Sequence, residues 1–423
     1  MAATVTTRPA TSHVRWTVCA LLFFATTVNY VDRQVLSLLA KTLETQIGWT
    51  DIQYSNITSA FTFAYMVGLL VSGWFLDKYG TRLGFSIAIV VWSVAAMAHA
   101  AATTAFTFGL ARAFLGLSEA ANFPACIKTI AQWFPKRERA QATGIFNAGS
   151  NIGAVVAPLT VPWLAVHYGW QSTFIITGAL GFIWLIFWLM MYRAPEDHPA
   201  VSSTELNLIQ SDPRDRSSSY PWARLIPHRE TWAFAVGKFL TDGVWWFYLF
   251  WLPKYLQDTF QLTLLQITIP VMVVYNASSV GSVFGGWLSS SRIKAGWSVN
   301  SARKFAMLTC AVAVLPVIYA PYSKNMWVVV ALVSIATAAH QGWSANLYTT
   351  VSDTFPRFAV GSVVGIGGAA GGLGGVLVQK AAGYVVTITH SYFLMFLFCG
   401  LAYVVALAII QLLTPKLAPA RLD

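Results

Sequence analysis

Charged residues are scarce in this sequence. Only 10% of its 423 residues are Asp, Glu, Lys or Arg, 56% are hydrophobic, and the mean hydropathy is +0.59. A soluble protein of this length carries about 25% charged residues, so the composition excludes a soluble globular domain. Its apolar stretches are about 20 residues long, enough for an α-helix to cross a bilayer and about twice the length of a barrel strand. The sequence therefore predicts an all-α membrane protein with many crossings.

Motifs for metal, disulfide and nucleotide binding are also missing. The four cysteines lie in apolar stretches without Cys-x-x-Cys spacing, which indicates small buried side chains. A glycine-rich run at residues 361–375 lacks a Gly-Lys-Ser/Thr sequence and follows no predicted strand, so it does not indicate phosphate binding. Small residues on a membrane helix instead allow close helix packing. With no metal cluster and no nucleophile paired with histidine, we expect no cofactor, no metal and no enzymatic activity.

Twelve apolar stretches are predicted to be transmembrane helices, six on each side of a polar segment. The first six lie near 14–37, 56–76, 82–101, 106–131, 140–164 and 171–192. The second six lie near 231–257, 265–290, 303–321, 326–350, 358–386 and 391–413. The segment between them is rich in Pro, Ser, Asp and Arg, which predicts a linker with a short surface helix near 205–210. The expected domains are residues 1–192, the linker 193–230 and residues 231–423.

Basic residues sort by side of the membrane rather than gathering on one face, so the net charge of +11 does not indicate nucleic-acid binding. With both termini cytoplasmic, 19 of the 27 Lys and Arg residues fall in cytoplasmic segments and 5 in the membrane. The outer loops then hold only Lys41, Lys254 and Lys324. Because cytoplasmic loops carry the excess of Lys and Arg, this distribution predicts that both termini are cytoplasmic.

Eight ionisable residues interrupt the apolar stretches. They are Asp32, Arg33, Arg112, Glu119, Lys128, Lys238, Asp242 and Lys380. A charge at the bilayer centre costs about 3 kcal/mol on insertion scales, so these residues must face an interior cavity or one another. Five are basic and three are acidic, which indicates an interior that favours anions. Such residues usually mark the path of an ion or a solute through the membrane.

The two halves of the chain repeat the same local sequences. Residues 73–82 (GWFLDKYGTR) end the second predicted helix, and residues 286–294 (GWLSSSRIK) end the eighth, 213 residues later. Residues 134–136 (FPK) and 355–357 (FPR) close the fourth and the tenth helix at an offset of 221. Two similar offsets indicate duplication, and repeated halves are typical of secondary transporters.

These motifs carry a family resemblance. Residues 73–82 resemble the signature between helices 2 and 3 of the major facilitator superfamily. The spacing Arg112-x-x-x-Gly116-x-x-Glu119 and the Gly/Pro-rich stretch 144–158 are similar to the same superfamily. The resemblance covers essentially the whole chain and implies twelve transmembrane helices in two pseudo-symmetric six-helix bundles.

One departure from the repeat concerns a latch. We expect Asp77 and Arg82 to form a gating latch at the cytoplasmic mouth, where a charge-paired loop can stabilise an outward-facing state. The second copy of this loop has Ser290 where the first has Asp77. The latch is therefore expected to be asymmetric.

A finer resemblance rests on three further segments. Residues 29–33 (NYVDR), 340–342 (HQG) and 353–357 (DTFPR), with Arg112 and Glu119, resemble the anion:cation symporter family and within it the bacterial hexuronate and sugar-acid transporters. This resemblance implies a multi-pass protein of the bacterial cytoplasmic membrane, which we expect to be a monomer. Its expected partners are a small anionic sugar acid, protons and the lipid bilayer.

Helical geometry groups the charges of the first half. Arg112 and Glu119 are two turns apart and share one face, either as part of a binding site or as a charge network that ties helices together. Tyr30 and Arg33 share a face, and an Arg fork suits a carboxylate, so we expect both to bind the substrate carboxylate. Asp32 points about 100° away from Arg33. The family resemblance implies that Asp32 and Glu119 carry protons; the alternative is a permanent Asp32–Arg112 salt bridge.

In the second half, Lys238 and Asp242 are four residues apart on a helix and can pair with each other. The pair is either a neutralised structural pair or a contributor to the cavity. An aromatic run follows at 245–248, in which Trp246 and Tyr248 are candidates to stack on a sugar ring. The alternative for both is packing or anchoring at the membrane interface.

Other hydrogen-bonding groups occur at membrane depth, where a hydroxyl-rich ligand needs partners. With Arg112, the substrate-binding candidates are Tyr65, Asn147, Ser150, Asn151, Trp343 and Asn346. The alternative for each is a hydrogen bond between helices. His340 is either a proton site or a satisfied buried histidine, and Lys128 and Lys380 stay open as residues that can reach an interface.

These patterns favour a proton-coupled symporter of a sugar-acid anion, above all a hexuronate such as glucuronate or galacturonate. Protonating Asp32 or Glu119 removes a negative charge that repels the anion, so proton and solute travel together. Open alternatives are sodium as the coupling ion and another organic anion, such as the aldonate galactonate. A membrane enzyme lacks a catalytic constellation here. A transporter-like sensor lacks a signalling tail, since 13 residues precede the first predicted helix and ten follow the last.

Overall fold

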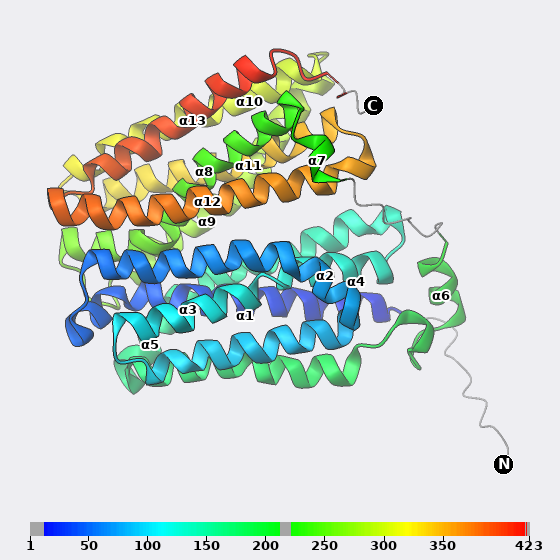
Figure 1. The fold of residues 1–423 in the computed structure, drawn as a ribbon, viewed down its shortest axis with the longest axis horizontal. Helices are drawn as coiled ribbons and strands as arrows, with labels where there is room; N and C mark the ends of the chain where they lie inside the picture. The colour runs from blue at the N-terminus through cyan, green and yellow to red at the C-terminus, as the bar shows by residue number, and fades with distance from the viewer. Residues whose placement is uncertain (1–11, 212–220, 419, 421–423) are drawn as a thin grey trace.

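All regular elements are helices within the residues that the computed structural model describes, which are 12–211, 221–418 and 420. Residues 212–220 of the predicted linker lie outside this description. The helices of the first half and those of the second half form two groups that lie side by side (Figure 1). The short helices α6 (Ser203–Ile209) and α7 (Trp222–Leu225) lie at one end of the molecule, which we call the linker end; the opposite end is the far end.

The first half runs between the two ends six times. Its elements are α1 (Val14–Ile47), α2 (Asp51–Ala98), η1 (His99–Ala101), α3 (Ala105–Glu119), α4 (Asn122–Trp133) and α5 (Lys136–Met191). At Gly80 in α2 and Gly169 in α5, φ is +74° and +81°, a left-handed conformation that favours glycine. The chain doubles back at Gly80, because a Cβ on Gly84 would lie 3.6 Å from the Cα of Leu76, eight residues earlier. The two long helices α2 and α5 therefore supply two crossings each.

The second half follows η2 (Pro195–Asp197), α6 and α7 and also makes six crossings. Its elements are α8 (Arg229–Phe260), α9 (Thr268–Lys294), α10 (Val299–Val314), η3 (Leu315–Tyr322), α11 (Met326–Thr354), α12 (Arg357–Thr389) and α13 (Phe393–Leu413). Eight helices in the described residues are long and apolar enough to span a membrane, α2 and α5 among them. With these two counted twice, and with α3–α4 and α8 added, the predicted twelve crossings are confirmed. The exact domain limits at residues 192 and 231 stay a prediction.

The predicted helix at 106–131 is wrong in one respect, because it is broken in the middle. Helix α3 ends at Glu119, and α4 begins at Asn122. Pro124 has no amide hydrogen to donate to the carbonyl of Ala120, which weakens the helix at this point and favours a break there. The break falls directly after one of the buried carboxylates.

The placement of two lysines also needs correction. Helix α1 continues to Ile47 and α8 to Phe260, further than the sequence predicts. Lys41 therefore lies within α1 and not in an outer loop, and Lys254 lies within α8, inside the predicted range 231–257, although the charge count assigns it to an outer loop. Their partners are described with the functional site.

Glycines allow neighbouring helices to approach closely. A Cβ on Gly281 of α9 would lie 2.1 Å from the carbonyl oxygen of Ala338 in α11. A Cβ on Gly116 of α3 would lie 2.4 Å from the carbonyl oxygen of Phe61 in α2. Along the glycine run of α12, positions 367, 371 and 375 receive side chains of α8 in the same way, namely Phe234, Asp242 and Trp246. The interpretation of this run as a packing surface is confirmed.

Helix α6 is fastened to the start of α1 by one carboxylate. Glu205 accepts hydrogen bonds from Ser12 Oγ, from the backbone amides of Val14 and Arg15, and from the Arg15 guanidinium at 2.9 Å. Burial alone would raise the pKa of Glu205, but these hydrogen bonds outweigh it and hold the pKa below its usual value. Arg15 also pairs with Glu138 of α5 at 3.0 Å. The predicted surface helix of the linker is confirmed and is tied to two helices of the first half.

We expect Gly281→Ala to destabilise the protein and Gly286→Ala, in the same helix, not to do so. The first change forces a methyl group against the backbone of α11, and such overpacking costs about 1–3 kcal/mol. A Cβ on Gly286 would meet nothing within 4 Å. Thermal unfolding in detergent, followed by loss of the monodisperse size-exclusion peak, measures both. Equal unfolding temperatures for the two variants would contradict the close α9–α11 contact.

Candidate functional site

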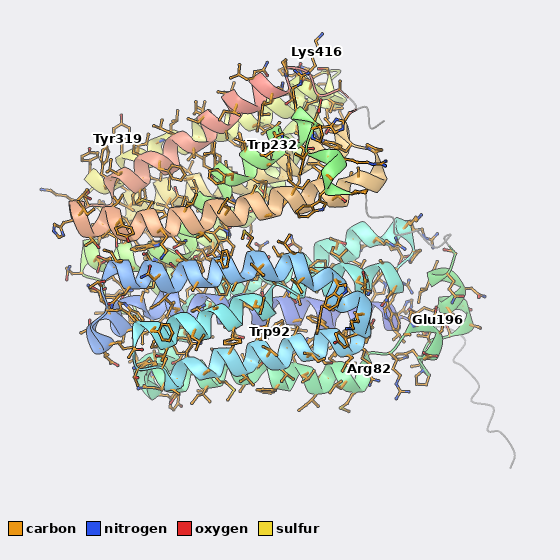
Figure 2. All side chains as sticks on the ribbon, in the orientation of Figure 1. Arg82, Trp92, Glu196, Trp232, Tyr319 and Lys416 are labelled. Atoms are coloured by element: carbon orange, nitrogen blue, oxygen red, sulfur yellow. The ribbon has the colours of Figure 1, made fainter. Side chains whose placement is uncertain are left out.

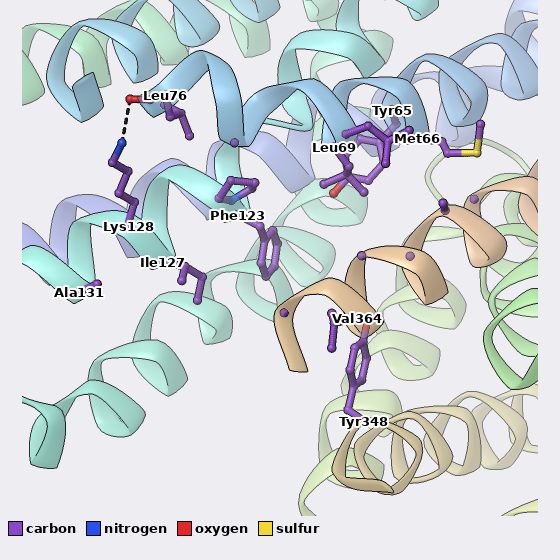
Figure 3. Close-up of a pocket in the computed structure, with 18 of the residues that line it drawn as sticks. Tyr65, Met66, Leu69, Leu76, Phe123, Ile127, Lys128, Ala131, Tyr348 and Val364 are labelled. Carbon is purple, nitrogen blue, oxygen red and sulfur yellow. Dashed lines mark hydrogen bonds between the residues drawn. The ribbon is translucent and has the colours of Figure 1, made fainter. Parts of the chain in front are cut away.

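A cavity of about 1520 Å³ separates the two halves of the molecule. Its walls come mainly from α1, α2 and α4 of the first half and from α8, α11 and α12 of the second. In the close-up of Figure 3, Phe123 lies on one side of this space and Tyr348 and Val364 on the other. The cavity continues to the linker end, where Glu196 and Trp222 border it, and it therefore exceeds the ~300–1,000 Å³ of a typical ligand pocket.

Some of the predicted site residues line this cavity and others do not. The lining residues are Tyr30, Arg33, Tyr65, Asp77, Lys238, Asp242 and Trp246. The residues away from its wall are Asp32, Arg82, Arg112, Glu119, Asn147, Ser150, Asn151, Tyr248, Trp343 and Asn346. The wall thus combines a cation from each half, Arg33 and Lys238, with aromatic rings.

Arg33 lies between the cavity and a buried carboxylate. Its Nε and Nη2 atoms are each 3.0 Å from Glu119 Oε2, and Nη2 also donates to Asn29 Oδ1 at 3.2 Å. The guanidinium carbon is 4.7 Å from the ring centres of both Tyr30 and Tyr65. Arg33 is 3% exposed and Glu119 1% exposed. Arg33 therefore lines the cavity beside two tyrosine rings while its Nε and Nη2 bind the carboxylate behind the wall.

Asp32 and Arg112 form a second buried group behind the wall. The alternative of a permanent salt bridge between them is wrong, because the described residues contain no ion pair of this kind within 4.0 Å; Arg33 takes a carboxylate instead. Arg112 Nη1 donates to the carbonyl oxygen of Arg33 at 3.2 Å. Asp32 lies near Arg112 and Thr177 without a hydrogen bond of normal geometry to either. A buried, unpaired carboxylate is costly, and a proton on Asp32 removes that cost.

The cavity face of α11 differs from the predicted one. Gln341, Ser344 and Tyr348 line the cavity. Trp343 is fully buried, and the Nδ2 atom of Asn346 donates to the backbone of α9 at 2.9 Å, which is the helix–helix alternative. Polar residues at i, i+3 and i+7 share one face of a helix, so this spacing was the available signal for the correct face.

On α8 a stripe of four residues faces the cavity: Lys238, Asp242, Trp245 and Trp246. The predicted pairing is confirmed, because Lys238 Nζ lies 2.6 Å from Asp242 Oδ2. Tyr248 points away and is fully buried. His340 stacks on Trp245 with ring centres 5.2 Å apart, and its Nδ1 lies 2.7 Å from Tyr403 Oη. His340 therefore has partners in the packed interior of the second half.

The polar residues predicted on α5 do not reach the cavity. Ser150 Oγ donates to the carbonyl oxygen of Asn147 within the same helix at 2.6 Å, and Asn151 is half-buried. On this helix, Gly149 and Gly153 lie against the backbone of α1. This stretch of α5 serves helix packing, and part of the cavity wall beside it is formed by the apolar side chains of α4.

Comparison with known proteins decides the family. The family model of the Major Facilitator Superfamily matches residues 22–379. The chain belongs to the major facilitator superfamily. It is 32% identical over 377 residues to the hexuronate transporter of Escherichia coli (strain K12), covering 88% of this chain and 87% of that one. It is 28% identical over 408 residues to a probable galactarate/D-glucarate transporter of Bacillus subtilis (strain 168), covering 92% of this chain and 90% of that one.

A solved structure shares the superfamily fold. The crystal structure of a bacterial homologue of the human lysosomal transporter Spinster, in an inward-facing and occupied conformation, superposes with a TM-score of 0.73. The alignment covers 96% of this chain and 98% of that one at 18% identity. The likeness shows the fold.

The superfamily signature between the two crossings of α2 is engaged within its own half. Asp77 Oδ1 lies 2.7 Å from Lys128 Nζ, and Lys128 also donates to the carbonyl oxygen of Leu76 at 2.8 Å (Figure 3). Arg82 donates to the carbonyl oxygen of Leu189 in α5 at 2.6 Å. Arg82 lies toward the linker end of the molecule and Tyr319 at the far end (Figure 2). Lys128, left open by the sequence, is therefore the partner of Asp77 in this conformation.

Ion pairs between the halves close the far end of this superfamily member. Lys254 of α8, 2% exposed, pairs with Glu44 at 2.8 Å and Asp51 at 3.0 Å, both in the first half, and with Asp258 at 2.7 Å. Lys41 of α1 pairs with Asp258 at 2.8 Å. We call these five residues the far-end network. Their spacing of three and four residues along α1 and α8 was a usable signal, missed because the lysines were placed in loops.

Two further contacts cross between the halves. Tyr54 Oη of α2 donates to the carbonyl oxygen of Phe250 in α8 at 2.6 Å. Lys380 of α12 donates to the side chain of Asn56 in α2. Lys380 therefore belongs to the contact between the halves and not to the cavity wall.

The groups at the cavity wall suit the binding of a polar solute. In the described part of the chain, no group of three or more His, Cys, Asp and Glu side chains could hold a metal ion. The cavity offers cations, carboxylates and aromatic faces. These groups suit an anion that also carries hydroxyl groups.

We expect Lys254→Met to loosen the far end. The variant leaves three carboxylates with Lys41 alone, and the resulting repulsion acts across the contact between the halves. Spin labels at Thr103 and Lys324, one in each half, report the separation by pulsed electron resonance. We expect a new population at longer distance.

The matched control is Lys304→Met. Lys304 binds Gln411 and the carbonyl oxygens of Thr414 and Pro415, all within the second half. This control should leave the distance distribution unchanged. The same distribution in Lys254→Met and in the parent protein would rule out the network as a clamp.

Proposed function

We propose that this chain is a proton-coupled symporter that imports the anion of a sugar acid, with a hexuronate as the leading substrate. The observation that carries the proposal is the buried Arg33–Glu119 pair at the wall of the cavity. The names of the hexuronate and galactarate/D-glucarate transporters among its relatives support the sugar-acid class.

Coupling follows from competition for one guanidinium. Nε and Nη2 of Arg33 bind Glu119, and the second hydrogen of Nη2 is donated to Asn29, so only Nη1 is left for a substrate carboxylate and the two parallel hydrogen bonds of an Arg fork cannot form. A proton on Glu119 neutralises that carboxylate and frees the fork for the substrate. Tyr30 and Tyr65 hold the guanidinium plane at the cavity wall from both sides. A proton on Glu119 and an anion on Arg33 therefore favour each other. Either one alone leaves a buried charge without its partner.

Asp32 supplies a second place for a proton. It is 2% exposed and lies one residue from Arg33, near Arg112. Because its oxygens lack a hydrogen-bond donor of normal geometry among the described residues, a protonated Asp32 is the cheaper buried form. Loss of that proton would place a negative charge beside Arg112. We therefore assign Asp32 and Glu119 to proton coupling.

Transport proceeds by alternating access of the cavity to the two sides of the membrane. The excess of basic residues supports a cytoplasmic position for the linker end and for both termini. In the present conformation the cavity extends to that end, while the far-end network joins the two halves. Opening to the outside requires the far-end network to separate, because its ion pairs join the two halves. The proposed location is the bacterial cytoplasmic membrane, with the protein as a monomer.

Sodium coupling and an aldonate substrate such as galactonate are the alternatives that the same cavity admits. A sodium ion would replace the proton as the charge that offsets the anion. An aldonate keeps the carboxylate and changes the hydroxyl-bearing end. Both are decided by the uptake experiment below.

We expect Glu119→Gln and Asp32→Asn to abolish pH-driven accumulation of D-glucuronate while exchange of internal for external substrate continues. An amide cannot carry the coupling proton, yet in Glu119→Gln the Arg33 fork is free to bind substrate. The measurement is uptake of radiolabelled D-glucuronate into proteoliposomes under an imposed pH gradient, with accumulation lowered at least about tenfold. A sodium gradient at equal pH on both sides should drive no accumulation.

Glu205→Gln serves as the control, because Glu205 lies on the linker helix away from the cavity wall. This variant should still accumulate substrate under the pH gradient. Unchanged accumulation in both Glu119→Gln and Asp32→Asn would exclude these carboxylates as the coupling sites.

A further inference from the structure

The Lys238–Asp242 pair in the second half has no part in the carboxylate site described above. Both residues line the cavity, and their side chains are 7% and 19% exposed. Lys238 Nζ also lies 4.6 Å from the ring centre of Tyr348, which lines the cavity from α11. A buried ion pair whose ends reach a solute cavity offers both a donor and an acceptor to a ligand.

The pair and Arg33 line the same cavity from the two halves of the molecule. The guanidinium carbon of Arg33 is 5.8 Å from the ring centre of Trp246 in α8. Asp242 precedes Trp246 by four residues, which places it on the same helix face about 6 Å further along the axis. A sugar acid whose carboxylate binds Arg33 therefore extends into a space that Asp242 and Lys238 border.

The charge of the pair restricts what that opposite end can be. Lys238 and Asp242 neutralise each other at 2.6 Å. A second carboxylate at this place would share one ammonium with Asp242, and two buried negative charges against one positive charge is an unfavourable arrangement. Hydroxyl groups instead donate to Asp242 and accept from Lys238, which keeps the site neutral and its hydrogen bonds satisfied.

We propose that Lys238 and Asp242 bind the uncharged, hydroxyl-bearing end of the sugar acid and thereby select monoacids over sugar diacids. This inference rests on the proposed function, since it assigns the end of the substrate that Arg33 does not bind. It divides the sugar acids by chemistry: uronic and aldonic acids are monoanions and are accepted, whereas aldaric acids carry carboxylates at both ends and are disfavoured.

The surroundings of Asp242 fix its position for this role. A Cβ on Gly371 of α12 would lie 2.2 Å from Asp242 Oδ2, so a larger residue there would displace the carboxylate. Tyr348 supports the ammonium of Lys238 from the other side. The pair is thus held between α11 and α12 with its polar atoms at the cavity.

A second pair on the same helix provides a contrast. Lys254 and Asp258 have the same spacing and a similar distance of 2.7 Å, but they belong to the far-end network and do not line the cavity. A change at Asp258 therefore tests the effect of breaking a Lys–Asp pair of α8 without touching the proposed binding position.

The experiment compares competition by a monoacid and a diacid. Uptake of radiolabelled D-glucuronate into proteoliposomes is competed by unlabelled D-glucuronate or D-glucarate, for the parent protein and three variants. The variants are Asp242→Asn, the double variant Lys238→Gln with Asp242→Asn, and the control Asp258→Asn. Quenching of tryptophan fluorescence in detergent, with Trp245 and Trp246 at the site, gives the same two affinities for a variant that binds without transporting.

We expect D-glucarate to compete at least about tenfold less well than D-glucuronate in the parent protein. Asp242→Asn leaves the Lys238 ammonium without its counter-charge, so the ratio should shift toward the diacid by about tenfold or more. The double variant is neutral at this position again. It should bind both acids weakly, and its competition ratio should shift back toward the monoacid. Asp258→Asn should keep the competition ratio of the parent protein, even where its transport rate differs.

Two results would overturn this inference and leave the proposed function standing. One is equal competition by both acids in the parent protein, and the other is a ratio that Asp242→Asn does not change. Failure of every sugar acid to bind or enter would overturn the proposed function together with this inference. The parent ratio needs no variant, so the first result is decisive even where a variant fails to fold.

Discussion

A cation within the apolar helices needs a polar partner, because lipid offers it neither water nor counter-charge. Several of the described cations are paired with carboxylates, whereas Arg112 donates to the carbonyl oxygen of Arg33 and Lys380 to the side chain of Asn56. Arg33 is matched by Glu119, Lys238 by Asp242, Lys128 by Asp77 and Lys254 by three carboxylates. These partners lie in different places. Glu119 lies behind the cavity wall, Asp242 on the wall, Asp77 toward the linker end, and the carboxylates around Lys254 at the far end. The need to pair buried charges thus accounts for ion pairs at the cavity and for the ion pairs that join the two halves at the far end.

The two halves use their charges differently although they share a fold. In the first half, the cation at the wall binds a carboxylate on another helix, and Asp32 beside it lacks a strong partner. In the second half, the cation and its carboxylate lie one turn apart on α8 and stay together when helices move relative to one another. A pair between helices can be altered by movement or by a proton, whereas a pair within one helix is a fixed feature of the surface. The first half is therefore suited to coupling and the second to recognition.

The sequence predicts what depends on spacing along one helix and misses what depends on the rotation of separate helices. The Lys238–Asp242 pair follows from a spacing of four residues. The Arg33–Glu119 pair joins two helices and competes with an equally reasonable Asp32–Arg112 pair, and sequence alone does not fix which side chains meet. The same limit explains α11, where Trp343 and Asn346 were chosen although the neighbouring face of Ser344 lines the cavity. The twelve crossings were predictable because bilayer thickness sets their length.

Charge balance links the two proposals. With Glu119 ionised and the cavity empty, Arg33 and Glu119 sum to zero, as do Lys238 and Asp242. With Glu119 protonated and a monoanion on Arg33, the sum is again zero. The loaded and the empty cavity then carry the same net charge, so neither state is penalised when the halves close around it in a low-dielectric environment. A dianion entering with one proton would leave a negative charge there, and the neutral Lys238–Asp242 pair offers nothing to offset it. Under the two proposals, monoacid selectivity and proton coupling through Glu119 follow from a single electrostatic condition.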